Sequence, residues 1–495
     1  MSKKHAYSLV LFAVLCGVSA LAFTAQRVKA QLLTVYIRAN GDVDPAWVPI
    51  QRNGDIYTFT GNMTVDGDAT GMIIERDNMT LDGAGHHFSR SPMAIYAIGI
   101  MLTERSNVTI KNLSISKFSD GVFLNSTFQT TIENNTIQTE SSGVTLISSS
   151  NNTISANNIT ENNSAGLKLI SSSYNSILRN TLMNNGRGVR LENSSNSNTI
   201  SQNKIAGGNI AGIDLCSFDL FQEHNRIFGN EIESNRYGVH FLLAFNGTIK
   251  GNNIENNTKG LVIYRSRNIT IAENTMIRNT DQGIYLDMSY DSRIYHNNFV
   301  DNGCAPHLYF SSATWDSGYP SGGNYWSDYN GTDLFSGLSQ EGTGSDGMGD
   351  DECVIDKNNK DNYPLMGPFH SFNTSLGKPV NIISNSTLKD FEYEPTGVIR
   401  FYVSNFTESQ TYGFCRVTIP HDVLSPPYNV TVNRANPIYW NYKLYNNGTH
   451  TWIYFEYEHS TLEVVIIPEL PFFAILPLFL TTTLLAALAY RRKRL

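Results

Sequence analysis

The sequence predicts an all-β protein: a parallel β-helix of about ten coils, followed by a small β-sandwich and a C-terminal transmembrane helix. Three observations support this prediction: a repeat of 22 or 23 residues, short apolar-x-apolar units within it, and a long uncharged segment near the C-terminus. Of the 495 residues only 16% are charged, and the net charge is −8. This acidic balance excludes a nucleic-acid binder, which needs a basic patch or stripe.

Residues 1–30 have the pattern of a secretory signal peptide. Lys3 and Lys4 precede an apolar run from Leu9 to Phe23, and Val28-Lys29-Ala30 offers small residues for cleavage. An uncleaved anchor helix is the alternative. In an exported chain, the nineteen Asn-x-Ser/Thr sequons between Asn62 and Asn447 are candidate glycosylation sites on exposed turns.

Residues 31–310 contain the repeat. Isoleucine recurs at steps of 22 or 23 residues, with one step of 27: Ile110, Ile132, Ile154, Ile177, Ile200, Ile227, Ile249, Ile271 and Ile294. From the second repeat on, an Asn follows three residues later, and a Gly-apolar-x-apolar unit such as Gly143-Val144-Thr145-Leu146 comes next. The apolar-x-apolar units are typical of strands with one buried face, and Gly, Asn and Ser favour turns between them.

One such repeat cannot bury its apolar face alone, so stacked coils of a β-helix are expected. A leucine-rich repeat is excluded because its Leu-x-x-Leu-x-Leu pattern is missing. The fixed-phase Asn residues are expected to stack as a hydrogen-bonded ladder, and Asn also tolerates the left-handed backbone that such turns require. The ladder residues are Asn135, Asn157, Asn180, Asn203, Asn230, Asn252, Asn274 and Asn297.

The Ile-x-x-Asn-x-Ile and Gly-Val-x-Leu repeats resemble the right-handed parallel β-helix family named after the periplasmic copper protein NosD. The opening segment Leu81-Asp82-Gly83-Ala84-Gly85-His86 is similar to the start of that family. Gly323-Asn324-Tyr325-Trp326 and Asp361-Asn362-Tyr363-Pro364 resemble segments that close the β-helix in archaeal surface members. The resemblance covers roughly residues 50–370 and implies the fold, but it implies little about activity because this fold has many functions.

Residues 311–375 lose the period and gain Gly, Asp, Tyr and Trp, so we expect a cap over the open end of the β-helix. Within it, Asp346, Asp350 and Asp351 lie in a Gly-rich segment. Hard cations bind carboxylate oxygens on such loops, so these residues are candidate calcium ligands. A solvated acidic turn is the alternative.

Residues 376–466 alternate β-rich runs with turn residues and predict a small β-sandwich. Its aromatic residues are expected mainly in the core, with sugar binding as the alternative: Tyr439, Trp440, Trp452, Tyr454 and Tyr457.

Residues 467–495 predict a membrane anchor. Leu470 to Ala489 carry no charge, and a basic tail from Arg491 to Arg494 follows. That length spans a bilayer as a helix, with the tail expected in the cytoplasm. The segment also resembles the PEF-type sorting signals of archaeal surface proteins, with Pro468-Glu469-Leu470 where that family has Pro-Glu-Phe. A retained anchor and a processed signal both fit, and either would place the body on the cell surface.

The x positions of the Gly-apolar-x-apolar units and the next outward positions predict one exposed face of the β-helix. A polysaccharide groove would use such acids, bases, cations and aromatics, whereas the alternative is a solvated face whose opposite charges offset each other. This candidate ligand face consists of Lys168, Arg190, Glu192, Asp214, His240, Tyr264, Tyr285 and Asp287.

Copper binding is not expected from the residues. A copper site needs clustered His, Met or Cys, and His86-His87 is the only adjacent His pair. The favoured function is a non-enzymatic, membrane-anchored surface protein that binds polysaccharides or surface-layer proteins and no nucleic acid. The alternative is a polysaccharide lyase or hydrolase on the same scaffold, although its catalytic residues are unknown.

Overall fold

The computed structural model describes residues 34–67, 70–91, 96–217 and 221–469, and all regular elements among them are β-strands. The predicted signal peptide and residues 470–495 of the predicted anchor lie outside these ranges. Within the described ranges, no helix has the length and apolar character needed to cross a membrane.

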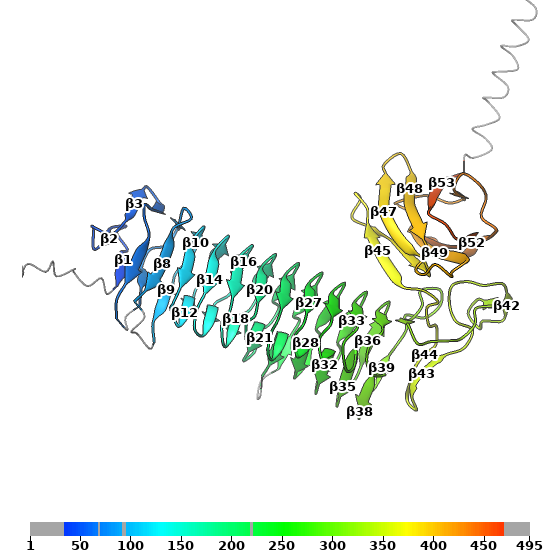
Figure 1. Cartoon of the computed structure of the whole chain (residues 1–495), viewed down its shortest axis with the longest axis horizontal. Helices are drawn as coiled ribbons and strands as arrows, with labels where there is room; N and C mark the ends of the chain where they lie inside the picture. Colours follow the sequence, from blue (N-terminus) through cyan, green and yellow to red (C-terminus); the bar gives the residue numbers. More distant parts are fainter. Residues whose placement is uncertain (1–33, 68–69, 92–95, 218–220, 470–495) are drawn as a thin grey trace, which may run out of the picture. The chain divides into compact units, whose positions relative to one another are not determined.

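The described residues form two compact units, up to Lys168 and from Leu169 onward. Both are built from coils of a parallel β-helix of the right-handed type, which confirms the main element of the predicted fold. In the first unit, β9 (Ile98–Thr103), β12 (Asp120–Asn125) and β15 (Ser142–Ile147) pair in parallel, with Val122 opposite Ile100 and Val144. In Figure 1 these strands run from light blue to cyan.

The other two sheets of the first unit repeat this parallel pairing. One contains β7 (Met79–Asp82), β10 (Val108–Lys111), β13 (Thr131–Glu133) and β16 (Thr153–Ser155). The other contains β5 (Met63–Val65), β8 (His87–Arg90), β11 (Ser114–Ser116), β14 (Thr136–Gln138) and β17 (Asn158–Thr160).

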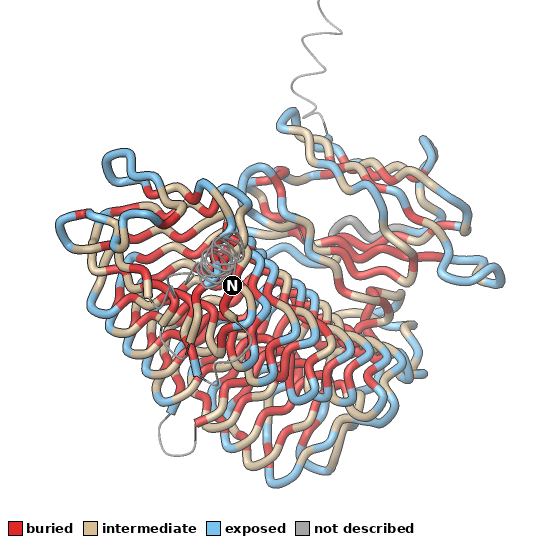
Figure 2. The backbone as a smooth tube through the Cα atoms, turned by 60° about the vertical axis from the view of Figure 1, so that its left-hand side comes forward, coloured by how far each residue is buried: buried red, intermediate tan, exposed pale blue. Residues whose placement is uncertain are grey.

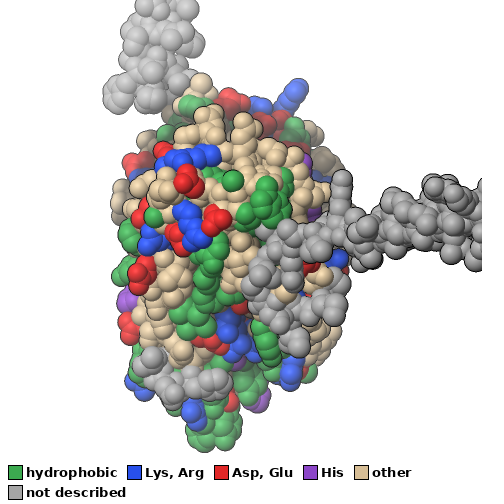
Figure 3. Space-filling model, turned by 90° about the vertical axis from the view of Figure 1, so that its left-hand side faces the viewer, with side chains coloured by type: hydrophobic (Ala, Val, Ile, Leu, Met, Phe, Trp, Pro, Cys, Tyr) green, Lys and Arg blue, Asp and Glu red, His purple; other side chains and the backbone are tan. Residues whose placement is uncertain are grey.

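The start of the first unit is irregular. β1 (Val35–Ile37) pairs antiparallel with β2 (Val43–Asp44), as β3 (Ile50–Asn53) does with β4 (Ile56–Phe59). Ion pairs lie at the surface here, including Arg38–Asp44 at 2.5 Å. Figure 3 shows cationic and acidic side chains beside one another on the N-terminal side of the molecule. Such exposed pairs contribute little to stability.

The second unit continues with three parallel sheets, named here by a central strand. The β24 sheet contains β21 (Arg187–Glu192), β24 (Ala211–Cys216), β28 (Tyr237–Leu242), β32 (Lys259–Tyr264), β35 (Ile284–Asp287) and β38 (His307–Tyr309). The β26 sheet contains β19 (Ser176–Leu178), β22 (Thr199–Ser201), β26 (Arg226–Phe228), β30 (Thr248–Lys250), β33 (Thr270–Ala272), β36 (Ser292–Tyr295) and β39 (Ala313–Thr314). The β27 sheet contains β20 (Thr181–Met183), β23 (Lys204–Ala206), β27 (Glu231–Glu233), β31 (Asn253–Glu255), β34 (Thr275–Ile277), β37 (Asn298–Val300) and β40 (Tyr325–Trp326).

The inward side chains of these coils form a continuous apolar core. The repeated isoleucines stack in register, as in Ile227–Ile249–Ile271, and all are fully buried. Figure 2 shows the buried strand residues lining the inside of the coils and the exposed residues at the turns. The repeated glycine allows close packing between coils: a Cβ on Gly238 would lie 2.6 Å from the carbonyl oxygen of Gly260.

Buried Asn residues form the ladder at one turn of the coils. In the second unit, the backbone N–H and Nδ2 of Asn252 both donate to Oδ1 of Asn274, at 3.0 and 2.9 Å. The residue with positive φ is the one before the ladder position, for example Gly251 (φ 63), so the ladder Asn does not itself supply the left-handed turn. The same donation links Asn135 to Asn157 in the first unit. In the second unit it runs along Asn180, Asn203, Asn230, Asn252, Asn274, Asn297 and Asn324.

The segment after the coils closes the ladder. The backbone N–H of Asn324 donates to Oδ2 of buried Asp361 at 2.7 Å, and the indole of Trp326 donates to the same oxygen at 3.1 Å. Asp361 therefore supplies the acceptor that a further coil would otherwise supply. The short pairs β41–β42 (Phe335–Ser336, Gly342–Thr343) and β43–β44 (Cys353–Asp356, Asn359–Asp361) belong to this segment.

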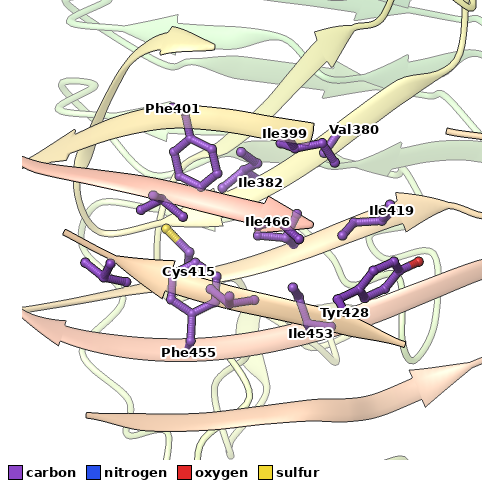
Figure 4. Packing of buried hydrophobic residues seen from close by; sticks show 14 of the residues in the cluster. Val380, Ile382, Ile399, Phe401, Cys415, Ile419, Tyr428, Ile453, Phe455 and Ile466 are labelled. Atoms are coloured by element: carbon purple, nitrogen blue, oxygen red, sulfur yellow. The ribbon is translucent and has the colours of Figure 1, made fainter. Parts of the chain in front are cut away.

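The C-terminal part has the two packed sheets of a β-sandwich. One contains β45 (Phe369–Asn373), β46 (Pro379–Ser384), β49 (Tyr412–Pro420), β52 (His450–Glu458) and β51 (Tyr439–Asn446). The other contains β47 (Thr387–Glu394), β48 (Val398–Ser404), β53 (Leu462–Pro468) and β50 (Tyr428–Val432). Figure 4 shows Phe401, Cys415, Phe455 and other apolar side chains packed between them.

Burial separates the aromatic residues of the sandwich that serve in its core from those that are exposed. Trp452, Tyr454 and Tyr457 are buried and serve as core residues, whereas Tyr439 is 38% exposed. Cys216, Cys304, Cys353 and Cys415 are all free thiols.

Candidate functional site

The outward side chains of the β24 sheet form rows because its strands pair in register. One row runs through Arg190, Asp214, His240, Val262, Tyr285 and His307. Adjacent residues in a row are about 5 Å apart, the distance between neighbouring strands. The members of the candidate ligand face that lie in the second unit are therefore neighbours in three dimensions.

Asp214 is the centre of the first cluster on this face. Its carboxylate is buried and accepts from His240 Nδ1 at 2.8 Å and from Arg187 Nε at 2.5 Å. Burial raises the pKa of Asp214, but these two partners outweigh burial and hold the pKa below its ordinary value. Because an ionised carboxylate only accepts, His240 must carry its proton on Nδ1 and present Nε2 as an acceptor when neutral.

Arg190 and Glu192 form an ion pair beside this cluster, and both side chains are largely buried. Tyr237 packs near His240, with the ring centroids 5.6 Å apart. Burial, and then the charge of Asp214, raises the pKa of the neighbouring Cys216 thiol, so that thiol stays protonated. The first cluster thus combines two carboxylates, an imidazole, two guanidinium groups and a phenol.

A second cluster lies further along the same sheet. Tyr285 stacks on His307 with centroids 4.7 Å apart and an angle of 8°. Lys259 Nζ lies 4.6 Å from the centre of the Tyr285 ring and pairs with Asp281 at 2.7 Å. The Tyr285 hydroxyl lies 3.5 Å from Asp287, and burial raises the pKa of Tyr285. Tyr264 lies opposite Asp287 in the adjacent strand.

Lys168 belongs to the first compact unit. There, its charge acts on Asp120, whose pKa is nevertheless raised by burial. Sequence reasoning missed Arg187, Tyr237 and Lys259. Each of these residues immediately precedes the glycine of its repeat. This constant position in the repeat is the sequence signal that identifies them.

Two of the three predicted calcium ligands, Asp346 and Asp350, accept hydrogen bonds from backbone N–H groups. Asp346 is fully buried beside Arg416 and accepts from the N–H of Met348 at 3.1 Å. Asp350 accepts from the N–H groups of Leu334 and Phe335, at 2.9 and 3.0 Å. Among the residues that the structure describes, no group of three or more His, Cys, Asp or Glu is arranged to hold a metal ion.

The coils and sheets define the class of this protein as a parallel β-helix protein. A family model described as "Periplasmic copper-binding protein (NosD)" matches residues 48–214, 191–247 and 209–331. These matches together span residues 48–331, more than half of the chain. The chain belongs to the NosD family.

Comparison with solved structures finds matches of low sequence identity, with TM-scores below 0.5. The A-module of a mannuronan C-5 epimerase from Azotobacter vinelandii is 14% identical, with a TM-score of 0.44, and the match covers 57% of this chain and 88% of that one. A periplasmic alginate epimerase gives 14% identity, a TM-score of 0.35 and coverages of 54% and 80%. Dettilon tailspike protein is 12% identical, with a TM-score of 0.35, and the match covers 83% of this chain and 86% of that one. A comparison with curated proteins finds no match.

The residues do not fit the copper named in the family description. The adjacent histidines are His86 and His87, and both ring nitrogens of His87 lie 2.8 Å from serine hydroxyls of the next coil, Ser114 and Ser116. A copper site needs several nitrogen or sulfur donors converging on one point. Within the described ranges, His, Cys and carboxylate side chains form no such group.

Proposed function

We propose that this chain is an exported, membrane-attached surface protein whose β-helix binds glycans along the β24 sheet. The observation that carries the proposal is the continuous outward row from Arg190 to His307, which holds two polar and aromatic clusters. A sugar chain needs hydrogen-bonding groups that fix orientation beside flat apolar surfaces. His240 and Arg187 offer the former, and the stacked Tyr285 and His307 offer the latter.

The export and attachment parts of this proposal rest on the sequence. The apolar run of residues 9–23 supports secretion, and the uncharged residues 470–489 with their basic tail support attachment. Surface-layer proteins and polysaccharides are the two candidate partners of such a chain, and we favour polysaccharides because the two clusters contain aromatic rings.

Glycan binding is tested by titrating the purified full chain with a panel of neutral and acidic oligosaccharides. We expect His240→Ala and Tyr285→Ala to weaken binding about tenfold, the effect of losing one good polar or stacking contact. His224→Ala and Tyr174→Ala are matched controls, because both side chains are exposed and lie outside the β24 sheet. Equal binding by all four variants would contradict the proposal.

A second candidate function, a carbohydrate-active enzyme, is favoured by the Asp214–His240 contact alone. A carboxylate that holds Nδ1–H leaves Nε2 free to accept a proton from substrate, the arrangement of a general base. Incubation of the full chain with polyuronates and neutral polysaccharides tests this function. If the natural chain forms new reducing ends or unsaturated products and His240→Ala does not, the enzyme becomes the favoured function over the binding protein.

A further inference from the structure

A cleft lies between the β-helix and the β-sandwich within the second unit. This cleft of about 660 Å³ is bounded by Arg226, Phe228, Lys250 and Glu273 on one side, and by His370 and Asn373 of β45 on the other. This volume is in the range of small-ligand sites.

The two sides of the cleft are held together by direct contacts. Asn298 of β37 forms two hydrogen bonds with the backbone of Phe369: its Nδ2 donates to the carbonyl at 3.0 Å, and its Oδ1 accepts from the N–H at 2.7 Å. The buried His296 ring stacks on Phe369, with centroids 4.2 Å apart. The cleft is therefore part of the packed structure.

The charges of the cleft favour an anion. Lys250 is balanced by Glu273, since their Nζ and Oε1 atoms are 2.9 Å apart. Arg226 is exposed, and within the described ranges no carboxylate pairs with it. Its guanidinium lies 5.9 Å from the centre of the Phe228 ring, and that ring is 36% exposed. A guanidinium over an aromatic ring can bind a carboxylate with two parallel hydrogen bonds.

The lining of the cleft also contains neutral polar groups. On the sandwich side, His370 Nε2 has no hydrogen-bond partner among the described residues, and this atom is buried from solvent. Burial lowers the pKa of His370 to about 4, so the ring is neutral at pH 7. Thr248, Thr275 and Ser371 add hydroxyl groups to the lining. One cation, one ring face and several hydroxyl partners match a sugar that carries a carboxylate.

We propose that this cleft binds an acidic saccharide, with Arg226 holding its carboxylate and Phe228 contacting the sugar ring. This site is separate from the face of the β24 sheet, and it goes beyond the glycan binding proposed there. Asn373 begins a sequon at the cleft, so its own attached glycan is the competing occupant.

The experiment is calorimetric titration of the purified full chain with hexagalacturonate, with maltohexaose as the neutral probe. We expect saturable binding of hexagalacturonate only, weakened about tenfold or more by Arg226→Ala and by Phe228→Ala. Arg293→Ala is the matched control: Arg293 lies in the same row of the β26 sheet and 5.4 Å from the Tyr295 ring centre, but not at the cleft.

Further arms separate this proposal from the others. If His240→Ala binds hexagalacturonate as tightly as the natural chain, the binding site is distinct from the β24 sheet. If His240→Ala loses this binding while Arg226→Ala keeps it, the cleft is not the binding site, and the function proposed for the β24 sheet still holds. Equal weakening by Arg293→Ala, or no saturable binding, also overturns it. Binding that appears only in Asn373→Gln would show that the attached glycan occupies the cleft in the native chain, and would overturn the proposal of a free saccharide.

Discussion

Asn252 illustrates how one residue connects three coils. Its Nδ2 donates to the carbonyl of Ile227 at 3.0 Å and to Oδ1 of Asn274, while its own Oδ1 accepts from the N–H of Asn230 at 2.9 Å. The side chain is buried, so water cannot replace these partners. A buried amide or carbonyl left without a partner costs about 1–3 kcal/mol.

We therefore expect Asn252→Ala to lower the free energy of unfolding by about 2–4 kcal/mol, since at least two buried backbone groups lose their partners. Urea unfolding followed by circular dichroism measures the change. Asn253→Ala is the control, because Asn253 points outward from β31 and is only half-buried; a change below about 0.5 kcal/mol is expected there. Equal effects of the two substitutions would contradict the ladder as a stabilising element.

At the scale of elements, the segment that closes the β-helix contains two carboxyl groups that burial strongly affects. Burial raises the pKa of Asp361 to about 7, although the N–H of Asn324 and the indole of Trp326 donate to it. Burial also raises the pKa of Asp333 to about 7, although hydrogen bonds from the N–H groups of Asp346 and Gly347 act to lower it. Each group binds its proton more tightly in the folded chain than in the unfolded one.

This segment should lose stability as the pH rises. With a folded pKa of about 7 and an unfolded pKa of about 4, the stabilisation is complete below about pH 4 and disappears as the pH rises through about 7. Burial lowers the pKa of His296 and of His370 to about 4. The stability that these two neutral rings contribute is therefore complete above about pH 6.5 and is lost only as the pH falls towards 4. Between about pH 6.5 and 8, the two carboxyl groups dominate.

The measurement is thermal unfolding at pH 6.5 and pH 8, followed by the fluorescence of the buried Trp315 and Trp326. We expect a lower midpoint at pH 8 in the natural chain. The combined change Asp333→Asn and Asp361→Asn should reduce this difference because it removes both titrating groups. A difference of the same size in the double variant would assign the pH dependence to other residues.

At the scale of the whole molecule, Arg416 of β49 links the sandwich to the closing segment. Its side chain is fully buried, with Nη1 3.5 Å from Asp346 Oδ2, and its Nη2 donates to the carbonyl of Pro320 at 2.7 Å. The sequence showed neither contact, because the partners are 70 and 96 residues away. Asp346 was predicted as a calcium ligand, whereas here its carboxylate is the buried counter-ion of Arg416.

Arg416→Met should destabilise the chain by about 3–5 kcal/mol, because it leaves Asp346 buried without a counter-ion. Urea unfolding and limited proteolysis between residues 337 and 351 measure the loss. Adding Asp346→Asn should restore part of it. The matched control is Arg400→Met: Arg400 is 36% exposed and 3.3 Å from Glu463, so less than about 1 kcal/mol is expected. A failure of Asp346→Asn to restore any stability would contradict this account.

Repetition made the β-helix predictable. Each coil uses the same apolar, Gly and Asn positions, so one local rule was visible nine times in the sequence. The sequence showed one Asn column, but the structure adds others, among them Asn175–Asn198–Asn225 and Asn235–Asn257–Asn279. Those columns were missed because they occupy turns where only some coils carry Asn.

The sequence by itself determined the strand–turn period, and with it which side chains point outward, because both follow from short-range patterns. Only the tertiary structure decided which outward groups meet. Asp214 takes Arg187 and His240 as partners from the coils on either side, and Phe228 and His370 share a cleft although they are far apart in the chain. These contacts depend on side-chain geometry and on how the sandwich folds back against the coils, and no local pattern of residues encodes them.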